Sequence, residues 1–225
     1  MKKPLAELVG TYLLVLLGTC AVTSALTIGG GRLEVAGIAT IGLTFGLALV
    51  AIAYAFGPIS GAHVNPAVTL GMVVAGKMKP GEAAGYWIAQ FAGGILAALT
   101  LQIGFGEIAD KYGYGANSPG KDFGVKGALV FEIASTMLFF LVIYGTAASK
   151  RAAAGFAGLP IGLYLAASHF AGIPISGSSL NPARDLGPAL LAGGDTLSGV
   201  WVYFAGPLAG AILGALVSKH LHEGD

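Results

Sequence analysis

Residues 59–71 read ISGAHVNPAVTLG and residues 175–187 read ISGSSLNPARDLG, and the two stretches are identical at eight of thirteen positions. In each, Asn-Pro-Ala opens a short apolar piece of 11 residues, 66–76 and 182–192. Asn is a preferred N-cap and Pro a preferred first helical residue, so each tripeptide predicts the start of a helix. At about 1.5 Å per residue, such a helix reaches about half the thickness of a membrane's hydrocarbon core. We therefore expect two re-entrant half-helices.

The composition is that of a protein with many membrane-spanning segments. Of its 225 residues 55% are hydrophobic and only 10% are charged, against about 25% in soluble domains, and the mean hydropathy is +0.79. Six segments approach the length of about 20 residues that a spanning helix needs: they are 4–28, 35–56, 82–104, 126–148, 155–173 and 198–219. The sequence therefore predicts an all-α membrane protein with six transmembrane helices and two half-helices.

The polar connection 105–125 divides the chain into halves, each with three spans and one short apolar piece. Glu7 and Thr11 recur as Glu132 and Thr136 in the second half. Since three spans are an odd number, the second half must enter the membrane from the opposite side. We expect a single channel domain over 1–225, with inverted repeats at about 1–104 and 126–225, and with the half-helices meeting by their N-termini near the midplane.

Two loops precede the half-helices, and their small residues let backbone carbonyl groups turn toward a water-filled cavity. The residues expected to present these carbonyls are Gly61, Ala62, His63, Gly177 and Ser179, next to Ser178. For His63 two interpretations stay open: it lines the cytoplasmic vestibule, or it only holds the loop. At the centre, two amide donors and two positive helix ends should repel cations and accept a neutral hydrogen-bonding molecule.

Glu7 and Glu132 are costly if they face lipid, so we expect both to brace the half-helix loops by accepting backbone N–H bonds. The alternative for Glu7 is a place at the level of the head groups. Glycines at four-residue spacing, Gly42 with Gly46 and Gly206 with Gly210 and Gly214, predict close helix contacts, either within the subunit or between subunits.

The paired Asn-Pro-Ala motifs in SGAHVNPAVTLG and SGSSLNPARDLGP, with Ala89-Gln90 and Gly93, resemble the aquaporin or major intrinsic protein family over the whole chain. The motif residues are Asn65, Pro66, Ala67, Asn181, Pro182 and Ala183. The resemblance implies an aquaporin-like fold, a passive channel for water, and a homotetramer with one pore per subunit.

The resemblance also implies a selectivity filter on the extracellular side, built from Phe45, His169, Ser178 and Arg184. This set of an aromatic residue, a histidine, a small residue and an arginine resembles the filter of the water-selective branch. Phe45 and His169 would narrow the opening, His169 and Arg184 would donate to one water oxygen, and the charge of Arg184 would repel cations.

Asp185 departs from that pattern, because an acid directly after this arginine is typical of glycerol facilitators. Its simpler interpretation is an acid favoured by the dipole in the first turn of a half-helix. We expect no pairing with Arg184, since neighbours in sequence do not face each other on a helix. A facilitator of glycerol or another small neutral solute, an ion-coupled transporter and a structural protein with a closed pore remain alternatives.

Basic residues in short loops favour cytoplasmic termini in a cell membrane. That side would hold Lys2, Lys3, Lys77, Lys79, Lys150, Arg151 and Lys219, and the far loops Arg32, Lys111, Lys121 and Lys126. The net charge of +1 without a basic block makes nucleic acid an unexpected partner, and the lone Cys20 excludes an intrachain disulfide. No cofactor, no metal site and no enzymatic activity are expected; the partners expected are water, possible small neutral solutes and the lipid bilayer.

Overall fold

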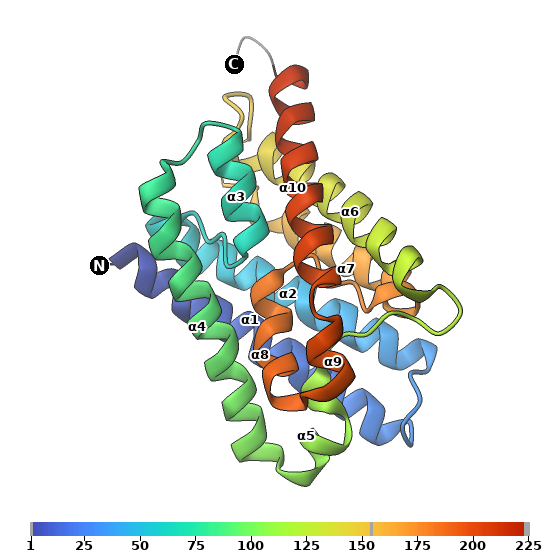
Figure 1. Cartoon of the computed structure of the whole chain (residues 1–225). Helices are drawn as coiled ribbons and strands as arrows, with labels where there is room; N and C mark the ends of the chain where they lie inside the picture. Colours follow the sequence, from blue (N-terminus) through green and yellow to red (C-terminus); the bar gives the residue numbers. More distant parts are fainter. Residues whose placement is uncertain (1, 154, 223–225) are drawn as a thin grey trace.

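The computed structural model describes residues 2–153 and 155–222; Met1, Ala154 and 223–225, which include both ends of the expected domain, lie outside this description. In the described residues every regular element is helical (Figure 1). The long helices are α1 (Lys2–Ile28), α2 (Val35–Ser60), α4 (Pro80–Phe105), α6 (Gly124–Ile143), α7 (Gly158–Ser176) and α10 (Val202–Leu221). The half-helices are α3 (Pro66–Val74) and α8 (Pro182–Ala192). The all-helical fold class is as predicted.

The helix ends differ from the expected ones. Both α2 and α7 continue past an internal proline, to Ser60 and Ser176, and so end later than predicted. They end there because Gly61 and Gly177 adopt the left-handed conformation, with φ of 89° and 85°. A π-helical turn, Tyr144–Ala148, extends α6, and the last span is preceded by a separate α9 (Gly194–Gly199). The connection expected as a plain loop contains α5 (Glu107–Lys111) and a 3-10 turn, Gly113–Gly115.

Six helical segments in the described residues are long and apolar enough to cross a membrane. Their outer faces carry large exposed apolar side chains, such as Ile28, Ile103 and Ile88 at 88%, 87% and 73% exposure. An apolar outer surface is what contact with lipid requires, whereas water would leave it unstable.

The glycine spacings lie at helix contacts inside the subunit. A methyl group on Gly42 of α2 would overlap Phe170 of α7, and one on Gly46 would overlap Ala166. A methyl group on Gly210 or Gly214 of α10 would overlap the backbone or side chains of α6. Both contacts therefore join spans of one chain, which the sequence left open.

The half-helices lie one above the other between α4 and α10 (Figure 1). α8 packs against α4, and α3 packs against α10, so each half-helix rests mainly on a span from the other half of the chain. Gly187 and Gly94 let α8 and α4 approach closely, because a methyl group on Gly187 would overlap the carbonyl oxygen of Gly94 and one on Gly94 would overlap that of Ala183. This packing brings the starts of α3 and α8 together.

Candidate functional site

Two asparagines tie the starts of the half-helices to each other. Asn65 Oδ1 accepts a hydrogen bond from the backbone N–H of Ala67 at 2.8 Å, and Asn181 Oδ1 accepts one from Ala183 at 3.0 Å, so each residue caps its own helix. Each side-chain nitrogen then reaches into the other half: Asn65 Nδ2 donates to the carbonyl of Leu180 at 2.7 Å, and Asn181 Nδ2 donates to that of Val64 at 2.9 Å.

This crossing changes the expectation of two free amides at the centre. A side-chain amide carries a pair of N–H donors, and here one donor of each amide is used by the opposite loop. The loop bond uses one N–H of each asparagine amide and leaves its second N–H donor out of that bond. The loop bond also fixes the orientation of that remaining donor.

The loops before both half-helices have the same unusual backbone. Ala62 and Val64 have φ of 47° and 44°, and Ser178 and Leu180 have φ of 57° each. Such left-handed values are uncommon for residues with a Cβ and persist only where the surroundings enforce them.

Buried glutamates supply that enforcement. Glu7 accepts hydrogen bonds from the backbone N–H of His63 at 3.0 Å and of Val64 at 2.6 Å. Glu132 accepts the equivalent bonds from Ser179 and Leu180, both at 2.8 Å. Both carboxylates are 0% exposed, so Glu7 and Glu132 lie inside the bundle. Charge-assisted bonds of this kind are about twice as strong as neutral ones.

A series of cavities runs past these loops. The central cavity, about 20 Å³, is lined by both asparagines together with Phe45, His169 and Arg184. An inner cavity of about 50 Å³ is lined by Gly61, Ala62 and His63 and shares His63 with the central one.

An outer cavity of about 280 Å³ is lined by Asn117 and Gly177 and shares Arg184 with the central cavity. The three cavities therefore follow one another through the molecule.

Three of the four expected filter residues meet at the central cavity. The rings of Phe45 and His169 stack at 4.5 Å between centroids, and the guanidinium carbon of Arg184 lies 5.4 Å from the Phe45 centroid. Arg184 Nη2 donates to the carbonyl of Gly115 at 2.9 Å. Within residues 2–153 and 155–222, Arg184 Nε and Nη1 have no hydrogen-bond partner.

His169 differs from its expected role as a donor. Its Nδ1 lies 2.8 Å from the carbonyl oxygen of Leu165, and because a carbonyl only accepts, Nδ1 carries the proton. In the neutral ring Nε2 is then an acceptor, so Arg184 is the donor at this point of the passage.

Ser178 does not join the other three through its side chain. The residue is 0% exposed, and its hydroxyl lies 2.8 Å from that of Ser168, which in turn lies 2.7 Å from that of Ser135. Ser178 is also absent from the lining of the three cavities. Its hydroxyl therefore ties the loop to α7 and α6 behind the passage.

His63 lines two cavities and also contacts the half-helix that follows its loop. It lines the central and inner cavities, and its Nδ1 lies 3.1 Å from the hydroxyl of Thr69, which also accepts from Gln90 at 2.9 Å.

The contact between Arg184 and Asp185 corrects an expectation. Arg184 Nη1 lies 3.6 Å from Asp185 Oδ1, although neighbours on a helix point in different directions. The long arginine side chain folds back far enough to reach the carboxylate.

Sequence reasoning also missed Gly115 and Asn117, because the connection that carries them has no periodic pattern from which a contact could be inferred.

Comparison with known proteins agrees with this geometry. The family model described as "Major intrinsic protein" matches residues 1–218. Aquaporin Z of Rhodopseudomonas palustris is 41% identical, with 97% of this chain and 92% of that protein covered. Glycerol uptake facilitator protein-like 6 of Lactiplantibacillus plantarum is 40% identical over 100% of both chains.

Among solved structures, the aquaglyceroporin from Plasmodium falciparum superposes with a TM-score of 0.83 at 25% identity, covering 99% of this chain and 95% of that one. The fold is therefore aquaporin-like, as the sequence predicts. The chain belongs to the major intrinsic protein family and is a multi-pass membrane channel.

Proposed function

We propose that this channel conducts water passively and excludes ions and protons. The observation that supports water most strongly is the volume of the central cavity, about 20 Å³. A cavity of about 10–15 Å³ on this measure holds one water molecule. Glycerol, which has six non-hydrogen atoms, needs several times that room.

The charges along the passage support the exclusion of cations. Each half-helix directs roughly half a positive charge at the central cavity, and Arg184 adds a full one beside it. A neutral molecule that can both donate and accept hydrogen bonds meets the asparagine donors, Arg184 and the acceptor on His169. We propose that Phe45, His169 and Arg184 form the filter of the passage.

A glycerol facilitator is the second candidate. It is favoured by Asp185 after Arg184, by the relative named a glycerol uptake facilitator protein-like, and by the likeness to an aquaglyceroporin. The small volume of the central cavity, about 20 Å³, weighs against it.

We also propose an arrangement of the chain in the membrane. The two halves form an inverted repeat, both termini lie on the cytoplasmic side of the cell membrane, and the subunits assemble as homotetramers with one passage each. The excess of basic residues on the side of the termini supports this orientation. Water is the solute and lipid the surroundings, and no covalent chemistry takes place.

Stopped-flow swelling of proteoliposomes tests the function, with water and glycerol measured on the same preparation and protein-free liposomes as the control. We expect fast water flux, glycerol flux near the control, and no dependence on a sodium or proton gradient. Glycerol entry comparable with that of water would favour the second candidate, and gradient-dependent flux would favour a coupled transporter.

A further inference from the structure

A second buried charge lies next to Arg184. Asp185 is 2% exposed, and a carboxylate at that depth is costly unless it is paired and hydrogen-bonded. In the repeat the corresponding residue of the first half is Thr69, which is neutral, and Val68 stands where Arg184 stands. The second half therefore carries an ion pair that the first half lacks.

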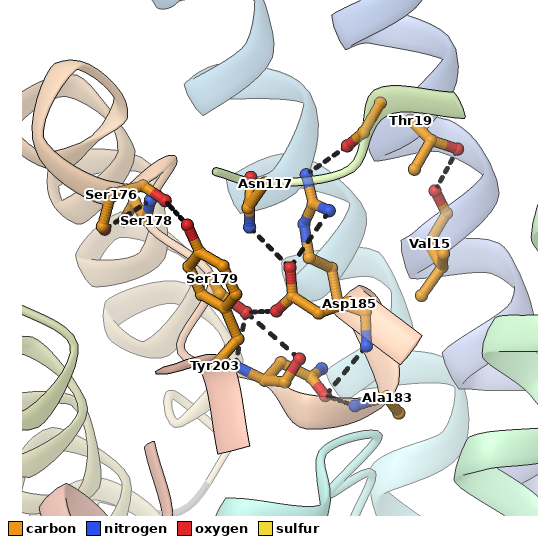
Figure 2. A network of polar contacts seen from close by, with 12 residues as sticks. Val15, Thr19, Asn117, Ser176, Ser178, Ser179, Ala183, Asp185 and Tyr203 are labelled. Atoms are coloured by element: carbon orange, nitrogen blue, oxygen red, sulfur yellow. Dashed lines mark hydrogen bonds and ion pairs between the residues drawn. The ribbon is translucent and has the colours of Figure 1, made fainter. Parts of the chain in front are cut away.

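The Asp185 carboxylate joins three segments of the chain. Oδ1 accepts from Asn117 Nδ2 at 2.9 Å and lies 3.6 Å from Arg184 Nη1, and Oδ2 accepts a hydrogen bond from the Ser179 hydroxyl (Figure 2). Asn117 comes from the connection after α5, Ser179 from the loop before α8, and Arg184 from α8 itself.

The connection that carries Asn117 also holds Arg184 directly. Gly115, two residues before Asn117, accepts the Nη2 hydrogen bond of Arg184 at 2.9 Å. Thus Gly115 and Asn117 hold the guanidinium from two directions, one by a direct bond and the other through Asp185.

The connection itself is fixed to the bundle. Gly115 packs against the backbone of Thr19, and Gly120 donates to the carbonyl of Ile175 at 2.9 Å. Asn117 is packed so closely on Gly177 that a side chain at position 177 would overlap it. Asn117 therefore has a defined place between Gly177 and Asp185.

We propose that Asn117 and Asp185 are a positioning pair that fixes the Arg184 guanidinium at the central cavity, and so sets how strictly the channel rejects solutes larger than water. This inference rests on the proposed function of the passage. Without the carboxylate, only the Gly115 hydrogen bond and the contact with the Phe45 ring hold the guanidinium, which can then swing toward the outer cavity of about 280 Å³. The passage then widens on average, while the positive charge stays.

The experiment compares Asp185→Asn and Asn117→Ala with the parent in proteoliposomes, and measures water, glycerol and potassium flux. Asp185→Asn keeps the shape of the side chain and removes its charge. We expect it to raise the ratio of glycerol to water permeability by roughly tenfold, the low end of what one pocket group contributes to discrimination between substrates. Asn117→Ala should change the ratio in the same direction. Potassium flux should stay at the level of protein-free liposomes, because the guanidinium remains charged.

The double variant tests whether the two residues act as a unit. If Asn117 acts through Asp185, the double variant should shift the ratio no further than Asp185→Asn alone. Asp195→Asn is the matched control, since it removes an exposed carboxylate on the neighbouring α9, and it should leave the ratio unchanged.

Several outcomes would overturn the proposal. One is an unchanged ratio in both single variants, and another is a proportional fall of water and glycerol flux, which would mark Asp185 as merely structural. Potassium leakage in Asp185→Asn would point to general disruption. If Asp185→Asn does not assemble, the ratio of glycerol to water permeability in Asn117→Ala decides whether the proposal holds. Fast glycerol flux through the parent would contradict water selectivity, yet the shift between parent and variants would still test the pair.

Discussion

The side-chain nitrogen of Asn65 lies 2.7 Å from the carbonyl oxygen of Leu180, 115 residues further along the chain. The reciprocal bond from Asn181 to Val64 makes the start of each half-helix depend on the loop of the other half. The centre of the passage is therefore held by the two halves together.

Replacing Asn65 by Ala should weaken both the helix start and this crossing. Loss of an N-cap costs about 1 kcal/mol, and leaving the buried Leu180 carbonyl without a donor costs about 1–3 kcal/mol more. We expect a lower unfolding temperature in detergent and reduced water flux per channel. Asn181→Ala should behave alike, and a large difference between the two variants would argue against equivalent roles.

Glu132→Gln should destabilise the loop before α8. The carboxylate accepts hydrogen bonds from the Ser176 hydroxyl and from the N–H groups of Ser179 and Leu180. The glutamine amide replaces one of the two accepting oxygens by an NH₂ group, which can only donate. The loss of stability should be about 3 kcal/mol. Thermal unfolding in detergent measures it, with Glu82→Gln as the control because Glu82 lies in an exposed ion pair with Lys3. Equal behaviour of the two variants would contradict the bracing role.

The half-helices, their caps and the helical fold could be predicted because Asn-Pro and hydrophobic length act locally along the chain. The contact between Arg184 and Asp185 was missed, since spacing on a helix gives the direction of Cβ but not the reach of a long side chain. The direction of the Ser178 hydroxyl and the tautomer of His169 depend on Ser168 and Leu165, partners that tertiary packing supplies. Asn117 was missed because an irregular connection carries no periodicity.

Gly187→Ala should separate α8 from α4. A methyl group at this position overlaps the Gly94 backbone, which cannot rotate away as a side chain can, so the cost should be about 1–3 kcal/mol. Gly104→Ala is the matched control, because Gly104 lies in α4 with open space around it and should be neutral or slightly stabilising. Unfolding temperatures in detergent compare the two, and a tolerated Gly187→Ala would contradict the close approach of the helices.

Arg184→Val introduces the residue found at the corresponding position of the first half, Val68. The substitution leaves the buried Asp185 carboxylate without its cation, which should cost about 3 kcal/mol. Adding Asp185→Asn removes the unpaired charge and should restore part of that loss in the same unfolding measurement. A double variant less stable than Arg184→Val would show that the carboxylate is held by Asn117 and Ser179 with no need of the arginine.

His169→Gly combined with Phe45→Ala should admit glycerol. These two rings stack at 4.5 Å and wall the central cavity of about 20 Å³, so their removal enlarges that cavity. We expect glycerol flux well above that of the parent in the swelling assay, with water flux retained. Phe91→Ala is the control, because Phe91 stacks on Phe204 at 5.8 Å in a cavity beside α3 and α8 and away from the passage. If the double variant folds and still rejects glycerol, the constriction lies elsewhere along the series of cavities, and the assignment of Phe45 and His169 fails.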